Sequence, residues 1–297
     1  MNPLTAFLKR HSLAIGVILM FALTWPIDLA NSGVLPIKFP FLVYLFLGWG
    51  FGVASVIMTG LTLGKDAMIA LLKRFLIWRV DWKWYLAAFL LMPSMQIVSI
   101  LLGAALSQTP IDFSTVYAYK IFGSSASLAL FIIPFFLIDA IANGEEIGWR
   151  GYVLPRLQLK YSALASSLIL GVIWGFWHLP KYLSHWDTVT FALFIVGTTA
   201  RAVLYTWLYN NTKGSLLVVT LFHASSNTGG VFLPLANTAV DGDLTTSIIQ
   251  ALLEVIVVVV VTVITGPARL SRTEPMQVQE QASVLPDQIS QSVSARM

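Results

Sequence analysis

Long apolar runs separated by short polar segments make up most of the chain. Eight runs are long enough to cross a bilayer, because a hydrocarbon core of about 30 Å needs roughly 20 helical residues. They lie near residues 12–31, 39–62, 84–106, 125–143, 161–179, 189–209, 214–233 and 245–266. Backbone amides cannot face lipid unpaired, and the runs lack the alternating polarity of membrane strands. The pattern therefore predicts an all-α membrane protein, a polytopic bundle of about eight transmembrane helices.

The composition supports a membrane location. Of the 297 residues, 57% are hydrophobic and 11% are charged, whereas a soluble domain carries about 25% charged residues. The mean hydropathy is +0.78. Cysteine is absent, which excludes disulfides, cysteine nucleophiles and cysteine metal sites.

Positive residues cluster in alternate connections between the apolar runs. The clusters contain Lys9, Arg10, Lys65, Lys73, Arg74, Arg79, Lys83, Arg150, Arg156, Lys160, Lys213, Arg269 and Arg272. In an eight-pass topology all of them fall on one side, which the positive-inside rule assigns to the cytoplasm. We therefore expect an integral protein of a bacterial-type cytoplasmic membrane with both termini in the cytoplasm and the loop of Asp241 and Asp243 outside. No persuasive cleavage site follows the first run, so we interpret it as a retained helix.

The chain divides at residue 266. Residues 1–266 are predicted to form a single transmembrane domain, because no repeat of 20 to 50 residues divides them. From Pro267 onward the chain is rich in Gln, Ser and Glu and poor in aromatic residues. Residues 267–297 are therefore predicted to be a polar, disordered tail.

Ionisable side chains lie at the end of the fourth run, in the sequence ANGEEIGWRG. Glu145, Glu146 and Arg150 are costly at membrane depth, and such groups usually face a bundle interior or a wet cavity. Arg201 in a later run is expected to pair with Asp139 or Glu254, or to line the cavity.

Two of the four histidines, and one asparagine, also lie in apolar sequence. His178 ends the run LILGVIWGFWH, and His223 lies within SLLVVTLFHASSN. Asn227 follows His223 by four residues, so both side chains project from one helical face.

A helical hairpin formed by the fourth and fifth runs would bring these groups together. With a turn near residue 161, Glu145 lies about 24 Å and His178 about 25 Å from the turn, at matching depth. This register requires the fourth helix to continue past residue 143, through Gly151 toward Pro155. It pairs Glu146 with Arg150 one turn apart and directs Glu145 about 100° away. We expect Glu145 and His178 to approach within one water or to hydrogen-bond directly.

Taken singly, each polar group has a structural explanation. The glutamates and arginine could form an ion pair that locks helices together, and histidine and asparagine could form interhelical hydrogen bonds. Their shared depth favours a functional site. A proton-relay transporter and a non-catalytic immunity or scaffold protein are the alternative functions, although neither internal repeats nor two matched broken helices are evident.

Three motifs in this order resemble a known family. EEIGWR, the Trp174 to His178 spacing in WGFWH, and HASSN are similar to the EExxxR, FxxxH and HxxxN signatures of the CAAX-protease and bacteriocin-processing family, also called CPBP or Abi intramembrane endopeptidases. The resemblance covers about residues 124–230. The sequence departs from the pattern at Trp174, which replaces the usual Phe or Tyr but keeps an aromatic ring.

The resemblance implies a catalytic membrane domain that hydrolyses peptide bonds. Glu145 and His178 would activate water, and His223 and Asn227 would stabilise the oxyanion, with Glu146 and Arg150 in support. Its expected partners are a peptide or membrane-protein substrate and the lipid bilayer, and not nucleic acid.

The need for a metal stays open. The resemblance fits a metal-free glutamate mechanism and also a metalloprotease, in which Glu145, His178 and His223 could hold zinc. Asn227 favours the metal-free alternative, because it is a poor zinc ligand and a good oxyanion donor. No HExxH motif is present.

Overall fold

The computed structural model describes residues 3–123, 128–183, 187–235 and 244–272, and these residues contain helices and no strands. The helices are α1 Pro3–Arg10, α2 Ser12–Asn31, α3 Phe41–Leu45, α4 Trp49–Leu63, α5 Lys65–Lys73, α6 Trp82–Ser107, α7 Ala118–Phe122, α8 Leu128–Ala142, α9 Glu145–Gly148, α10 Leu154–Gln158, α11 Ala163–Trp177, α12 Leu179–Leu183, α13 Thr188–Asn211, α14 Leu216–Phe232 and α16 Thr245–Thr265. Short helical turns lie at Arg74–Leu76 and Phe113–Thr115, and a π-helical turn spans Trp149–Val153.

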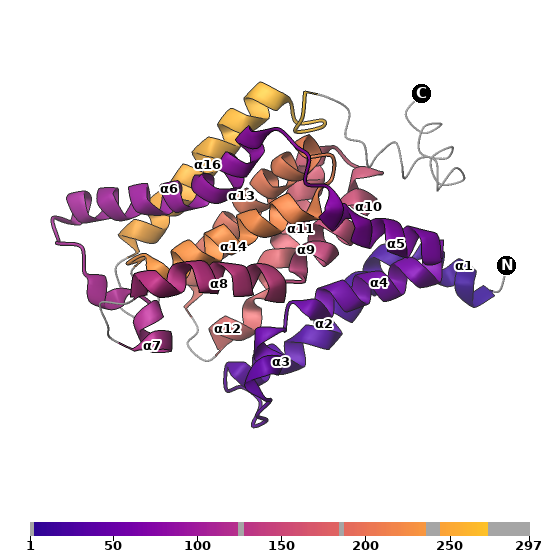
Figure 1. Cartoon of the computed structure of the whole chain (residues 1–297), viewed down its shortest axis with the longest axis horizontal. Coiled ribbons are helices and arrows are strands. Elements are labelled where there is room, and N and C mark those ends of the chain that lie inside the picture. Colours follow the sequence, from indigo (N-terminus) through magenta and orange to yellow (C-terminus); the bar gives the residue numbers. More distant parts are fainter. Residues whose placement is uncertain (1–2, 124–127, 184–186, 236–243, 273–297) are drawn as a thin grey trace.

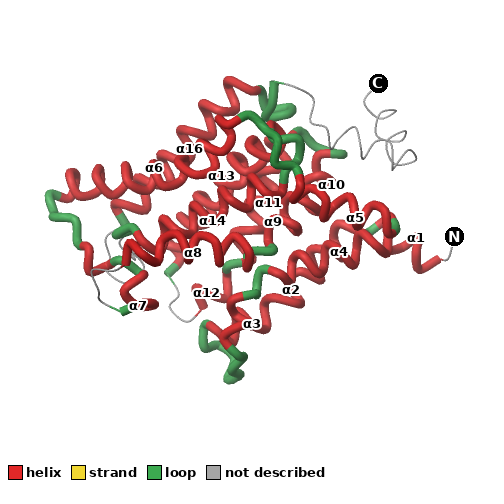
Figure 2. The backbone as a smooth tube through the Cα atoms, viewed as in Figure 1, coloured by secondary structure: helices red, strands yellow, loops and turns green. Residues whose placement is uncertain are grey.

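The all-α fold predicted from the apolar runs is confirmed (Figures 1 and 2). By length and composition, five helical segments can cross a membrane, namely Ser12–Asn31, Trp82–Ser107, Leu128–Gln158, Thr188–Asn211 and Thr245–Thr265. Three shorter apolar helices, Trp49–Leu63, Ala163–Trp177 and Leu216–Phe232, correspond to the remaining predicted spans. The protein is thus an integral membrane protein.

The fourth span is long, as its register required, but it is interrupted at Asn143 and Gly144, which was not predicted. α8 ends at Ala142, and the helical path resumes at Glu145 and continues through the π-helical turn to Gln158. Asn143 causes part of the break, because its Oδ1 accepts the Glu145 N–H at 3.0 Å and so replaces a helical partner. A four-residue turn then leads into α11, where the Ser162 hydroxyl caps the Ala165 N–H. π-helical turns are frequent at functional sites.

Glycines allow α4 to lie directly against this break. A Cβ at Gly144 would be 2.7 Å from the Cα of Trp49, and one at Gly48 would be 3.2 Å from the Gly144 nitrogen. One turn further along, a Cβ at Gly148 would lie 2.8 Å from the Cβ of Phe51, and one at Gly52 would lie 3.0 Å from Cδ1 of Ile147. Small residues spaced in this way, Gly48 with Gly52 and Gly144 with Gly148, let membrane helices pack closely. α4 therefore fixes the position of α9.

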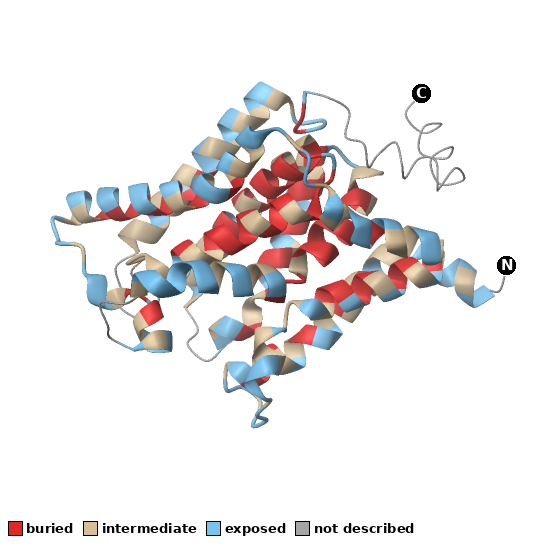
Figure 3. Cartoon of the chain, in the orientation of Figure 1, coloured by how far each residue is buried: buried red, intermediate tan, exposed pale blue. Residues whose placement is uncertain are grey.

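Burial is concentrated on α9, α11, α13 and α14 and on the facing sides of α2 and α4, whereas α6, α8 and α16 form much of the exposed perimeter (Figure 3). The largest fully buried side chains include Trp149, Trp177, Arg150 and Tyr205. On the perimeter, exposed apolar side chains such as Val263 and Leu130 suit contact with lipid. A buried arginine in this core requires a counterion.

Polar groups also tie the outer elements to the bundle. Arg201 on α13 lies 3.8 Å from the carboxylate of Glu254 on α16, which settles its partner in favour of Glu254. At the start of α13, Asp187 accepts the Thr190 hydroxyl and the Val189 N–H, and these hydrogen bonds hold the pKa of Asp187 below its ordinary value.

The first residues of the predicted tail pack on the bundle. The Ala163 N–H donates to the Ala268 carbonyl at 2.8 Å, and the Asn210 amide donates to the Arg269 carbonyl at 2.7 Å. Residues 273–297 lie outside the described residues, as does the loop of Asp241 and Asp243. The domain boundary at 266 stays a prediction.

Candidate active site

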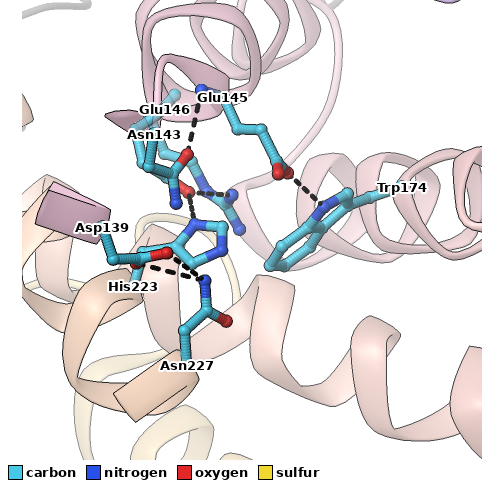
Figure 4. Close-up of polar contacts among 8 residues, drawn as sticks. Asp139, Asn143, Glu145, Glu146, Trp174, His223 and Asn227 are labelled. Carbon is cyan, nitrogen blue, oxygen red and sulfur yellow. Dashed lines mark hydrogen bonds and ion pairs between the residues drawn. The ribbon is translucent and has the colours of Figure 1, made fainter. Parts of the chain in front are cut away.

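The six residues singled out by the sequence come from three neighbouring parts of the bundle. Glu145, Glu146 and Arg150 lie on α9 and the π-helical turn, His178 caps the end of α11, and His223 and Asn227 lie one turn apart on α14. Figure 4 shows how the polar side chains around His223 converge.

A fully buried ion pair holds His223. Arg150 Nη1 lies 3.0 Å from Glu146 Oε1, as the spacing predicted, and both side chains are 0% exposed. The same Oε1 lies 2.8 Å from Nδ1 of His223, a contact that the sequence analysis missed. Because a carboxylate only accepts, Nδ1 of His223 carries a proton and Nε2 is left for another partner. The Arg150 guanidinium also lies over the rings of Trp174 and Tyr205, at 4.6 and 4.1 Å.

Glu145 and His178 are linked through Trp174. The indole Nε1–H of Trp174 donates to Glu145 Oε2 at 3.0 Å, and its backbone carbonyl lies 2.9 Å from His178 Nδ1. That carbonyl only accepts, so Nδ1 of His178 donates and Nε2 remains as the basic atom. Both side chains are described, and no direct hydrogen bond joins them. Their approach through one water therefore stays a prediction.

Asp139 is the site residue that the sequence analysis did not recognise. Asn227 Nδ2 lies 3.3 and 3.2 Å from the two carboxylate oxygens of Asp139 (Figure 4). A sequence signal for it existed, because Asp139, Asn143, Glu146 and Arg150 recur at spacings of four, three and four residues. That spacing is typical of one helical face.

The donor set fits a zinc site poorly. Within the described part of the chain, no group of three His, Cys, Asp or Glu side chains is arranged to hold a metal ion. Of the proposed ligands, Glu145 is hydrogen-bonded to Trp174 and His223 to Glu146.

Comparison with known proteins agrees with the motifs. Residues 125–229 match the family described as Type II CAAX prenyl endopeptidase Rce1-like. A curated relative, CAAX prenyl protease 2 of Methanococcus maripaludis, is 29% identical over 148 residues, which cover 46% of this chain and 51% of the relative. The chain thus spans about half the length of this relative. The resemblance to the CAAX-protease family is confirmed over the matched segment, which contains every candidate residue.

Proposed function

We propose that the chain is an intramembrane endopeptidase that hydrolyses a peptide bond of a membrane-associated or peptide substrate. The observation that carries the proposal is the convergence of a carboxylate, two imidazoles and a carboxamide from α9, α11 and α14 in an apolar bundle. Placing each of these polar groups at membrane depth costs free energy, and such groups usually serve a function. The family match supports the same reaction class.

Glu145 and His178 are proposed to activate the attacking water. The free oxygen of Glu145 accepts a proton as the water oxygen bonds to the scissile carbonyl carbon, and Nε2 of His178 accepts a second hydrogen bond from that water. Trp174 holds the other oxygen of Glu145 and the Nδ1 side of His178. In this proposal, the two contacts leave the other oxygen of Glu145 and Nε2 of His178 to bind the same water.

His223 and Asn227 are proposed to stabilise the oxyanion of the tetrahedral intermediate. Nε2 of a doubly protonated His223 and an N–H of Asn227 would donate to it, and removing one such donor typically costs about 3 to 4 kcal/mol. Glu146 accepts from the opposite side of the imidazole and is held by Arg150. Collapse of the intermediate breaks the C–N bond as the proton on Glu145 passes to the leaving nitrogen.

The first substrate to assay follows from the relative named as a CAAX prenyl protease. A prenylated peptide ending in a CAAX sequence, with a fluorophore and a quencher on either side of the cleaved bond, tests that class directly. An unprenylated copy tests the need for the lipid. We further propose a cytoplasmic location for both termini, from the charge distribution.

Purified protein in detergent is assayed with Glu145→Ala, His178→Ala and His223→Ala variants. Each should lower kcat by at least about 100-fold, whereas His11→Ala, a matched control at an exposed histidine that precedes α2, should not. Unchanged cleavage by folded Glu145→Ala protein would eliminate this mechanism. A chelator arm tests metal dependence, and loss of activity that zinc restores would overturn the metal-free roles proposed for Glu145 and His178.

A further inference from the structure

Asp139 reaches the site from α8, on the other side of the helix break from Glu145. Both of its carboxylate oxygens contact Nδ2 of Asn227. Its backbone carbonyl accepts the Asn143 N–H at 2.8 Å, which ties Asp139 to the residue whose side chain accepts the Glu145 N–H. The Asp139 carboxylate also interacts electrostatically with His223. None of the three sequence motifs contains this residue.

A carboxylate next to a carboxamide determines which way the amide faces. Carboxylate oxygens accept, so the NH2 of Asn227, and not its carbonyl oxygen, faces Asp139. The two oxygens of one carboxylate lie too close together to take both amide hydrogens in good geometry, so they share one N–H. The second N–H of Asn227 is then free to donate elsewhere.

Without this contact the amide of Asn227 could rotate by half a turn. Its carbonyl oxygen would then face the place where negative charge develops, and an acceptor there repels an oxyanion. A donor stabilises a transition state only when it is already oriented toward the developing charge. Figure 4 shows His223 between the Glu146 carboxylate on one side and the Asp139–Asn227 pair on the other. Each proposed oxyanion donor thus has its own carboxylate.

We propose that Asp139 is the positioning residue that orients the Asn227 amide as an oxyanion donor, as Glu146 does for His223. The inference rests on the proposed endopeptidase function. It assigns Asp139 no contact with the substrate and no proton transfer. Replacing Asp139 should therefore lower kcat, and only in protein that retains Asn227.

A double-mutant cycle tests this dependence. Asp139→Asn, which keeps the shape and removes the acceptor-only character, should lower kcat by about 10- to 100-fold with KM changed less than about twofold. In an Asn227→Ala background, the residual turnover should be the same with and without Asp139→Asn. Equal losses of kcat in both backgrounds, or no loss in either, would overturn the proposal.

Glu254→Gln is the matched control, because it neutralises another buried intramembrane carboxylate that pairs with Arg201 and does not touch Asn227. Its effect on kcat should be the same in the presence and absence of Asn227. A merely structural role of Asp139 would resemble this control, with a loss of thermal stability and no coupling to Asn227.

A second readout does not need activity. The side-chain amide signals of Asn227, identified in 15N-labelled protein by their loss in Asn227→Ala, should move toward the values of a solvent-exposed amide in Asp139→Ala. Unchanged signals would overturn the proposal. If wild-type protein cleaves none of the peptides, the proposed function fails, whereas the amide signals still report whether Asp139 orients Asn227.

Discussion

Replacing Gly144 with alanine tests how closely α4 and the helix break fit together. The added Cβ would lie 2.7 Å from the Cα of Trp49, 2.9 Å from the Gly48 carbonyl oxygen and 3.1 Å from the Trp49 nitrogen. These are backbone atoms, so no side-chain rotation can relieve the contacts. Gly144 has φ −84°, which alanine also adopts, and the test is therefore purely steric.

The expected cost follows from the geometry. Overpacking of this kind typically costs about 1 to 3 kcal/mol, which corresponds to a fall in Tm of roughly 2 to 10 °C for a chain of this size. Relief requires α4 to move away from α9. A Cβ at Gly48 would already lie 3.4 Å from the Cγ of Glu145, so that movement shifts the proposed catalytic carboxylate. A shift near 1 Å lowers kcat by about 100-fold.

Gly230→Ala is the matched control, because a Cβ at this helical glycine meets nothing within 4 Å. It should leave cleavage unchanged and raise stability by about 0.5 to 1 kcal/mol. The assays are thermal unfolding in detergent and peptide cleavage at equal protein concentration. If Gly144→Ala matches wild type in both, the backbone contact between α4 and α9 is not as tight as described, and the reasoning fails.

Three further substitutions test other contacts, each by thermal unfolding in detergent. Glu146→Gln leaves the fully buried Arg150 without a counterion and should cost about 3 to 5 kcal/mol; a loss below about 1 kcal/mol would contradict the buried pair. Ser215→Ala removes the N-cap of α14 and the hydroxyl that donates to the Ile77 carbonyl at 2.6 Å, and it should lower the free energy of unfolding by about 1 to 2 kcal/mol. An unchanged Tm would exclude that cap. Asp28→Asn should raise Tm, because both buried carboxylate oxygens of Asp28 lack a hydrogen-bond partner within the described ranges, and a lower Tm would reveal a favourable use of its charge.

The hydrophobic pattern predicted much of the fold because membrane helices must satisfy their own backbone. Matching the depths of Glu145 and His178 also predicted that the fourth helix runs past residue 143. That step needed only the rise per residue of a helix. The Glu146–Arg150 pair followed equally from local geometry, as one turn separates its members.

Contacts between distant segments could not be obtained in this way. Whether Glu146 meets His223, or Asp139 meets Asn227, depends on how far α14 is rotated against α8 and α9, and a single sequence does not specify that rotation. The Asn143–Gly144 pair was a local signal of the break, but it was not used in the sequence analysis. Its purpose became evident only when α4, nearly a hundred residues earlier, was found lying against it.

The contact between α4 and the helix break limits how the site can be grafted into another protein and how its sequence can change in evolution. The segment with family similarity begins at residue 125, well after α4, yet its helix break packs against Gly48 and Trp49 at the start of α4. Moving residues 125–229 alone into a foreign membrane protein would leave the break without its support, so a functional graft should carry residues 48–52 as well. During evolution, a larger residue at Gly144 or Gly48 should be retained only where the residues that face it have become smaller or the two helices have moved apart.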